Sequence, residues 1–187
     1  GEHLNPKYLR EKGVGHVPED RHRRALVMTF DAAENAMLGY HHDDVYGRGI
    51  LLDREAILAD TGRKMAEYDV RPPDVALRAN LFSGGNQQKL VLAREMARNP
   101  DLLIVGQPTR GVDIGAIEFI HKRLLAMRDA GKAILLVSVE LDEIRALSDR
   151  ILVMCAGDIG GECAAGASEN EIGLLMAGIT AGGAKAA

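Results

Sequence analysis

Two short apolar runs, separated by an amphipathic segment, most constrain what this chain can fold into. The runs "DLLIVG" (101–106) and "KAILLVSV" (132–139) have the length and aliphatic composition of buried strands. The segment between them, residues 116–131, ends in a glycine and repeats apolar side chains at helical spacing: Ile117, Ile120, Leu124 and Met127. Strands that alternate with helices pair in parallel, so the sequence predicts an α/β fold with a mostly parallel sheet.

Caps, turns and local patterning predict the remaining elements. Residues 12–17 are predicted as a strand, 18–24 as a charged loop, and 29–38 as a helix with Asp31 in its first turn. The stretch 83–100 is predicted as a long helix that Ser83 caps and Pro100 stops. Further along we expect a short helix at 140–148, two strands within 150–162 joined by a turn at Ala156–Gly157, a last helix at 169–178, and a flexible tail, "ITAGGAKAA".

Residues 39–80 differ in composition from the segments on either side. They are polar, contain the breaks "YGRG" and "RPPD", and hold one helical stretch at 53–70. We therefore predict a helical insert there. The predicted division of the chain has core segments at 1–38 and 81–165, the insert at 39–80, and a C-terminal helix with its tail at 166–187.

Composition narrows the class of protein. Of the 187 residues, 47% are hydrophobic and only 4% are aromatic, which indicates a mainly aliphatic core. The net charge of −4 is spread along the chain, whereas a nucleic-acid partner requires a clustered basic surface, so no nucleic acid is expected. No apolar run approaches the roughly 18 residues of a membrane span. The start has no signal pattern and no Met, so we expect the chain to begin inside a longer polypeptide.

Several residues are more simply explained by structure than by chemistry. Cys155 and Cys163 are expected to be free thiols in a reducing setting, not a disulfide framework or a metal cluster. His41, His42, Asp43 and Asp44 resemble a metal-binding cluster, but a solvated loop is the better interpretation. Met65 and Met96 are expected in the core. The run "RHRR" (21–24) could bind phosphate or acidic lipid, and a solvated or partner-facing loop is favoured.

The stretch "LFSGGNQQK" (81–89) is the most informative one. Two glycines follow a serine cap and open a helix, so the backbone N–H groups of Gly84, Gly85 and Asn86 are expected to be unpaired at the positive end of the helix dipole. The Ser83 hydroxyl can donate beside them, which suits the terminal phosphate of a nucleotide. An ordinary capped helix start would carry the same residues.

The neighbouring segments favour the nucleotide interpretation. "LFSGGNQQK" resembles the signature motif of ABC-type ATPases, in the variant found in bacterial sugar and nucleoside importers. "NPDLLIVGQPTRGVDIGA" resembles the Walker B strand and the D-loop, which includes Asp113, and "GVGHVPEDRHRRAL" resembles the Q-loop region. "KAILLVSVELDEIRALSDRILVMCAGDIGGE" resembles the switch strand, the helix after it and the closing hairpin of the core, and "EIGLLMAG" resembles the C-terminal helix. The resemblance extends over residues 8–178. More specifically, the chain resembles the second half of a tandem ATPase that serves importers.

This resemblance implies a P-loop NTPase-like core with a mostly parallel sheet and an inserted helical subdomain, truncated upstream of the Q-loop. The single Gly131–Lys132 pair is not a P-loop, because Ala133 follows it and Ala126 stands where the first glycine belongs. In the family, two halves sandwich each nucleotide between the P-loop of one and the signature motif of the other. ATP and Mg²⁺ would thus be bound mainly by the partner half, with five residues here completing that site: Ser83, Gly84, Gly85, Asn86 and Gln87.

The resemblance also implies partners and a location. The expected partners are a first ATPase half or a second ATP-binding subunit, together with membrane-spanning permease subunits. The expected location is the cytoplasm, peripheral to the inner face of the cell membrane. The rival interpretations are a non-catalytic scaffold half and a soluble ABC-type ATPase of DNA repair or translation.

Departures from the family pattern affect the chain's own catalytic site. Gly106 stands where an Asp supports Mg²⁺, and Gln107 where a Glu polarises the attacking water. Val139 replaces the switch His, and Glu19 replaces the Q-loop glutamine. A glutamine can hydrogen-bond water but cannot accept its proton at neutral pH. We therefore predict that no catalytic residue or metal site is intact and that this chain alone does not hydrolyse ATP.

Overall fold

The computed structural model describes residues 5–48 and 51–179. These fall into two compact units that divide between Val137 and Ser138, and each unit is described by itself. The tail predicted at the C-terminus lies, from residue 180 onward, outside the described residues.

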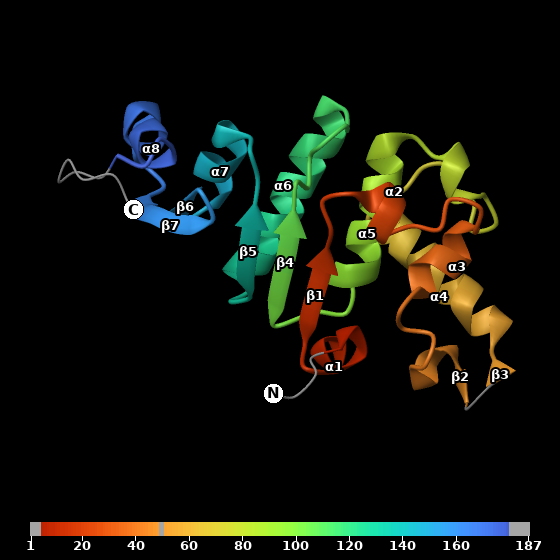
Figure 1. Cartoon of the computed structure of the whole chain (residues 1–187). Coiled ribbons are helices and arrows are strands. Elements are labelled where there is room, and N and C mark those ends of the chain that lie inside the picture. The colour runs from red at the N-terminus through yellow and green to blue at the C-terminus, as the bar shows by residue number, and fades with distance from the viewer. Residues whose placement is uncertain (1–4, 49–50, 180–187) are drawn as a thin grey trace. The chain divides into compact units, whose positions relative to one another are not determined.

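The first unit is built around three parallel strands, in the order β1, β4, β5 (Figure 1). They are β1 (Val14–Val17), β4 (Leu102–Gly106) and β5 (Ala133–Val137). In register, Val14 pairs with Leu102, and Leu102 with Ala133. The central strand is the most deeply buried, since Leu103 and Val105 are fully inaccessible to solvent. The predicted α/β fold with a parallel sheet is confirmed. The predicted strand 132–139 ends at Val137, so Val139 does not belong to it.

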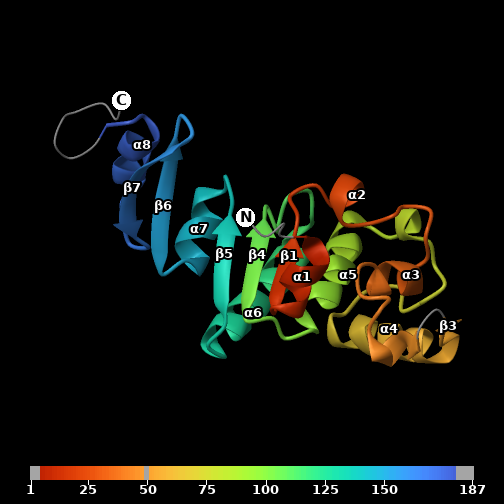
Figure 2. The same cartoon turned by 60° about the horizontal axis from the view of Figure 1, so that its bottom comes forward.

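Two long helices flank this sheet, and each begins at a side-chain cap (Figures 1 and 2). Helix α5 (Gly84–Met96) starts at Ser83, and it ends before the predicted residue 99 because Asn99 takes a left-handed backbone, φ 49°. Helix α6 (Ile114–Asp129) starts two positions earlier than predicted, because the Asp113 carboxylate accepts the Ala116 N–H at 2.9 Å.

A helical layer lies on the β1 side of the unit, away from β5 (Figure 1). It holds α3 (Ala32–Met37), α4 (Arg54–Glu67), the short turns η1 (Asp44–Tyr46) and η2 (Ala79–Leu81), and the hairpin of β2 (Gly47–Arg48) with β3 (Leu51–Leu52). Asp31 and Glu34 form a capping box at the start of α3. The apolar cluster of this layer joins residues on both sides of the predicted boundary at 38/39: Ala33, Tyr40, Tyr46 and Ile57. The helical layer thus includes α3, and the four-part division stays a prediction.

Two parts of the N-terminal region differ from the sequence prediction. The loop predicted at 18–24 contains one helical turn, α2 (Arg21–Arg24), because the Asp20 carboxylate accepts the N–H groups of His22 and Arg23 at 3.1 Å each. Helix α1 (Pro6–Glu11), which lies beside β1 in Figure 2, was not predicted. Its signal was present, since Asn5 caps the helix and Pro6 occupies the first position, where its missing N–H leaves no bond unmade.

A buried polar network ties α5 to β1 and α3. Glu95, only 1% exposed, accepts the Arg94 Nε at 2.8 Å, the Tyr40 hydroxyl at 2.7 Å and the His16 N–H at 3.3 Å. Arg94 Nη1 in turn donates to the Ala25 carbonyl at 2.7 Å and to the Asn35 carbonyl, in α3, at 3.2 Å. Burial, together with the charge and hydrogen bond of Glu95, raises the pKa of Tyr40 above its ordinary range.

The second unit is a hairpin packed against two helices. Strands β6 (Arg150–Cys155) and β7 (Asp158–Ala164) are antiparallel, with α7 (Leu141–Leu147) before them and α8 (Glu169–Met176) after them. The predicted turn is confirmed, because Ala156 and Gly157 take φ values of 51° and 94°. The core of this unit consists of Ile151, Val153, Cys163, Ala167 and Ile172.

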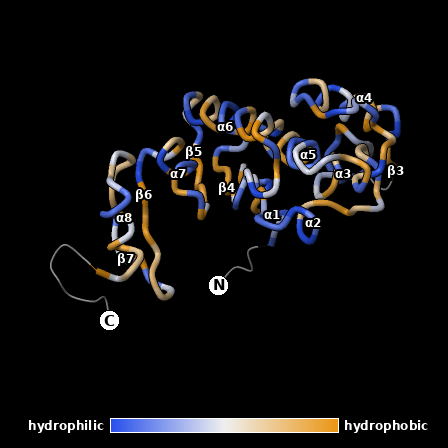
Figure 3. The backbone as a smooth tube through the Cα atoms, turned by 90° about the horizontal axis from the view of Figure 1, so that it is seen from above, coloured by the Kyte–Doolittle hydropathy of each residue, from blue (hydrophilic) through white to orange (hydrophobic). Residues whose placement is uncertain are grey.

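Other sequence predictions concern the core and the surface. Met65 and Met96 are buried, and both cysteines are free thiols, as predicted. In the hydropathy colouring β5 and β6 are hydrophobic and α2 is hydrophilic (Figure 3), although Leu135 and Val137 of β5 are exposed. No helix within the described residues is both long enough and apolar enough to cross a membrane.

Candidate nucleotide-contact site

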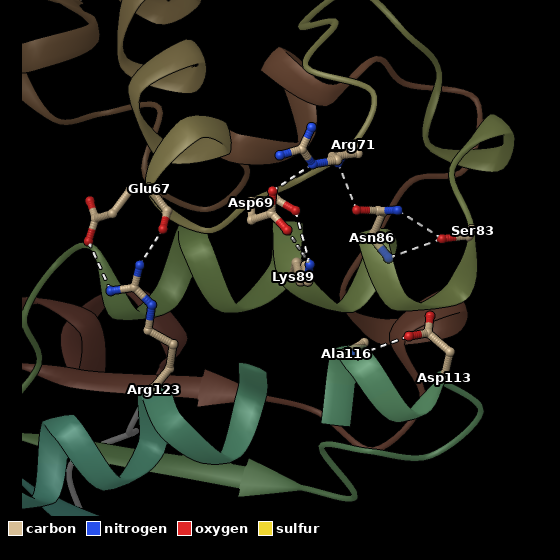
Figure 4. A network of polar contacts seen from close by, with 9 residues as sticks. All are labelled: Glu67, Asp69, Arg71, Ser83, Asn86, Lys89, Asp113, Ala116 and Arg123. Atoms are coloured by element: carbon tan, nitrogen blue, oxygen red, sulfur yellow. Dashed lines mark hydrogen bonds and ion pairs between the residues drawn. The ribbon is translucent and has the colours of Figure 1, made fainter. Parts of the chain in front are cut away.

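The start of α5 presents a serine hydroxyl and a glycine pair. Ser83 is exposed, and its Oγ accepts two hydrogen bonds from Asn86: one from the backbone N–H at 3.4 Å and one from the side-chain Nδ2 at 2.9 Å (Figure 4). The expectation that the Asn86 N–H would be unpaired is therefore wrong, because the cap reaches the third helical residue, as Ser caps commonly do.

Both glycines are required by close approach of neighbouring segments. A Cβ on Gly84 would lie 2.7 Å from the Gly111 carbonyl oxygen and 2.9 Å from Arg21 Nη2. A Cβ on Gly85 would lie 2.8 Å from Asp113 Oδ2. The signature-like segment thus packs directly against the D-loop-like segment of the same chain, and larger residues at 84 or 85 would push the two apart.

Gln87 turns inward, behind the exposed end of the helix. Its Nε2 donates to the carbonyls of Ala79 at 2.9 Å and Phe82 at 3.1 Å, and its Oε1 lies 2.8 Å from His22 Nε2. The side chain is 5% exposed. Gln87 therefore holds the motif in place and does not lie on the surface with Ser83 and Gly84.

Arg21, from α2, joins the two segments. Its guanidinium donates to the backbone carbonyls of Arg110 at 2.7 Å and Gly111 at 3.2 Å. Burial lowers the pKa of Arg21, and the charge of Asp20 opposes that effect. The charged run at 21–24 therefore has a positioning role in addition to any contact with a partner.

A polar cavity of about 290 Å³ lies beside the signature-like segment. Its lining residues are Asp69, Arg71, Gly85, Asn86, Lys89, Asp113, Gly115 and Ala116. Asp69 is paired there with Lys89 Nζ at 3.1 Å and Arg71 Nε at 2.7 Å, and these hydrogen bonds lower the pKa of Asp69 (Figure 4). The Asn86 Oδ1 accepts the Arg71 N–H at 2.7 Å, so the cavity wall and the cap are bonded to each other.

The end of β4 has a different character. Gly106 and Gln107 carry no charge, and Gln107 takes a left-handed backbone with φ 47°. A Cβ on Gly106 would lie 3.1 Å from the backbone nitrogen of Glu19, closer than such contacts normally come. Glu19 itself is ion-paired with Arg110 at 2.6 Å. The space that an aspartate at 106 would need is thus partly taken by the residue at 19.

The remaining predicted positions belong to neither of these segments. Val139 is part of the second unit and is exposed. Within the described residues, no group of three His, Cys, Asp or Glu side chains is arranged to hold a metal ion. In the histidine-rich stretch, His41 and His42 are exposed or partly exposed, and Asp43 pairs with Arg98.

Sequence reasoning missed the residues that act through contacts distant along the chain. Arg21, Arg71, Asp69 and Lys89 belong to this group. Nothing in their local pattern indicates such roles, because each bond joins segments that only the fold brings together. Asp20 is the exception, since an acidic residue before a short polar run is an ordinary helix-start signal.

The chain is similar to ATP-binding proteins of importers. It is 48% identical over 180 residues to the guanosine import ATP-binding protein NupO of Bacillus subtilis, a match that covers 96% of this chain and 35% of that protein. It is 49% identical over 174 residues to the nucleoside import ATP-binding protein NupA of Lactococcus lactis, covering 92% of this chain and 34% of that protein. The chain thus spans about a third of the length of these relatives. No protein-family model matches it.

A solved dimeric ATP-binding cassette, MJ0796 in a post-hydrolysis state with ADP and Pi, has a similar fold. The TM-score is 0.69 at 22% identity, over 89% of this chain and 70% of that one. The fold is therefore that of an ABC ATPase cassette. By sequence, the chain is a homologue of sugar and nucleoside import ATP-binding proteins and corresponds to part of an ABC-type nucleotide-binding domain.

Proposed function

We propose that this chain is part of the ATP-binding subunit of an importer of simple sugars or purine nucleosides. Within that subunit it forms most of the second of two ATPase halves and supplies the signature motif to ATP held by the partner half. The observation that carries the proposal is the start of α5, where Ser83 is exposed and Gly84 half-buried while the side chains of Asn86 and Gln87 are fixed by internal bonds. The importer relatives support the substrate class.

The chemistry of this contact is electrostatic. The Ser83 hydroxyl can donate a hydrogen bond, and the N–H groups of Gly84 and Gly85 lie in the first turn of a helix, where the dipole favours an anion. A γ-phosphate held by the partner half would meet these donors only when the halves close. Donors placed in advance at a transferring phosphoryl group stabilise its charge without reorganisation, so closure and hydrolysis would be coupled.

The chain's own catalytic site is proposed to be degenerate. At the end of β4 neither Gly106 nor Gln107 can supply a carboxylate, and Glu19 is already paired with Arg110. ATP and Mg²⁺ would therefore be bound productively by the partner half, and this chain alone would not turn over ATP. The complete subunit would bind permease subunits from the cytoplasmic side of the membrane.

The test is a substitution at Ser83 in the full-length ATP-binding protein assembled with its permease. Ser83→Arg adds bulk at an exposed position, so we expect ATP turnover to fall at least about 100-fold, the scale of losing a preorganised donor. Equilibrium ATP binding should change little, because the partner half's own P-loop holds the nucleotide.

Ser168→Arg is the matched control. Ser168 caps α8 in the same way, accepting the Glu171 N–H at 3.1 Å, and it is exposed. It should leave turnover close to wild type. Wild-type turnover in Ser83→Arg would contradict the signature role and favour a scaffold half that only pairs with its partner.

A further inference from the structure

The hydrogen bonds around Ser83 leave its hydroxyl free only to donate. A serine hydroxyl has two acceptor lone pairs and a single hydrogen. The backbone N–H and the side-chain Nδ2 of Asn86 both donate to Ser83 Oγ, at 3.4 and 2.9 Å. Both lone pairs are therefore occupied from the helix side, and the hydroxyl hydrogen is left to donate away from the helix.

The orientation of the Asn86 amide is itself determined by a third residue. The Arg71 backbone N–H can only donate, so the Asn86 atom 2.7 Å from it must be the oxygen, Oδ1. The other end of the amide, which faces Ser83, must then be the nitrogen. The bond to Arg71 thus dictates that Asn86 donates to Ser83 (Figure 4).

The segment that carries Arg71 is held against α5 and α6. Lys89, from α5, donates to the Asp69 carbonyl at 3.0 Å and to its carboxylate at 3.1 Å. The same ammonium lies 4.8 Å from the centre of the Phe119 ring on α6. Arg123, also on α6, bonds the Glu67 carbonyl at the end of α4 and lies over the Tyr68 ring at 4.6 Å. Residues 67–71 are therefore docked by several independent contacts.

We propose that Asn86 is a positioning residue that fixes the Ser83 hydroxyl as a donor toward the phosphate of the partner's ATP, and that it does so only while residues 69–71 are docked on α5. The inference rests on the proposed function, since it assigns the means by which Ser83 is oriented. Undocking of this segment would free the amide to turn and the hydroxyl to rotate. The end of α4 would then control the phosphate contact without touching the nucleotide.

A double-mutant cycle in the full-length protein with its permease tests this role. Asn86→Ala removes the side-chain donor but keeps the backbone N–H and a good helix former. We expect it to lower turnover at saturating ATP by about tenfold, the scale of one hydrogen bond, with ATP affinity unchanged. In a Ser83→Ala background the same change should have no further effect on turnover, because there is no hydroxyl left to orient.

Two more variants sharpen the cycle. Asn86→Asp keeps the acceptor for Arg71 but presents a second acceptor to Ser83, which turns the hydroxyl inward, so we expect a larger loss than in Asn86→Ala. Arg71→Ala is the matched control. It keeps the backbone N–H that orients Asn86 and removes only a mostly exposed side chain, so turnover should stay near wild type.

The outcomes separate this inference from the function it rests on. If Ser83→Ala leaves turnover unchanged, the proposed signature role fails. If Ser83→Ala lowers turnover but Asn86→Ala does not, or if Asn86→Ala is equally harmful with and without the Ser83 hydroxyl, the positioning role is overturned and the signature role stands.

Discussion

The start of α5 and the end of β4 belong to the same unit but differ in the polar groups that they offer to a nucleotide. Around Ser83 the side chains of Asn86 and Gln87 are paired internally, and the Ser83 hydroxyl is exposed. Around Gly106 neither residue 106 nor residue 107 carries a carboxylate, and a Cβ at 106 would lie 3.1 Å from the Glu19 backbone nitrogen. Phosphate contact needs only backbone and a short side chain, whereas hydrolysis needs carboxylates. Under the function proposed above, the phosphate contact would be kept at Ser83 while hydrolysis would not be supported at residues 106 and 107.

The largest effect is expected in the buried polar network that ties α5 to β1, outside both of these segments. Glu95→Gln removes the charge that neutralises buried Arg94 and weakens the tie between α5 and β1. Breaking a buried ion pair costs about 3 kcal/mol or more, so we expect the free energy of unfolding to fall by about that amount. Urea denaturation measures it. An unchanged midpoint would show that the Arg94–Glu95 pair does not stabilise the packing of α5 on β1.

The second prediction concerns Gly84, at the start of α5. Gly84→Ala places a methyl group against the Gly111 carbonyl and the Arg21 guanidinium, so the D-loop-like segment must shift. We expect turnover of the full-length protein to fall about 100-fold, as for loss of a positioned donor. Gly173→Ala is the control, because a methyl group there meets nothing within 4 Å. Equal activity of the two variants would mean that this close approach is not required. Gly84→Asp would add a like charge facing the phosphate and should be at least as damaging.

A smaller effect is expected on the pH dependence of the free energy of unfolding, through Asp60, which lies outside both segments. Burial raises the pKa of Asp60, but the hydrogen bonds from Lys64 and Tyr46 and the Lys64 charge outweigh it and lower the pKa to about 2. A carboxyl whose pKa is depressed on folding adds stability above its unfolded pKa of about 3.9, and that stability is lost as the pH falls toward 2. After a reduction for screening by solvent, we expect Asp60→Asn to lose about 1–2 kcal/mol less stability than the wild type over this pH range. Unfolding measured from pH 5 downward, in both proteins, checks it, and parallel curves would contradict it.

The smallest expected effect is none. Gly106→Asp with Gln107→Glu restores the two carboxylates at the end of β4, yet this chain should release no phosphate from ATP above background. The Gly131–Lys132 pair does not form a P-loop, and a side chain at 106 meets the backbone of Glu19. Magnesium-dependent phosphate release by the double variant, absent from a mock purification, would contradict this prediction. It would show that this chain alone binds ATP productively at the end of β4.

Local signals predicted much of this fold, and distant contacts account for the rest. The strands at 102–106 and 133–137 and the Ser83 cap arise from apolar runs and capping chemistry, which act within one turn or one strand. The substitutions at 106 and 107 were also visible in the sequence. The bond from Arg21 to Arg110, the bond from Arg71 to Asn86 and the crowding of residue 106 by residue 19 were not. They depend on how helices and strands dock, and no spacing along the chain encodes that.

The left-handed backbone at Gln107 has a consequence for what a randomised library of this chain would tolerate. If clones were selected for folding alone, position 107 should return glycine, asparagine and aspartate most often and exclude valine and isoleucine, since only the former accept a φ near 47° readily. Position 106 should return small residues most often, for a reason of space and not of backbone angle, since a Cβ there would lie 3.1 Å from the Glu19 nitrogen. Two adjacent positions would then vary under unrelated constraints, one of backbone angle and the other of space.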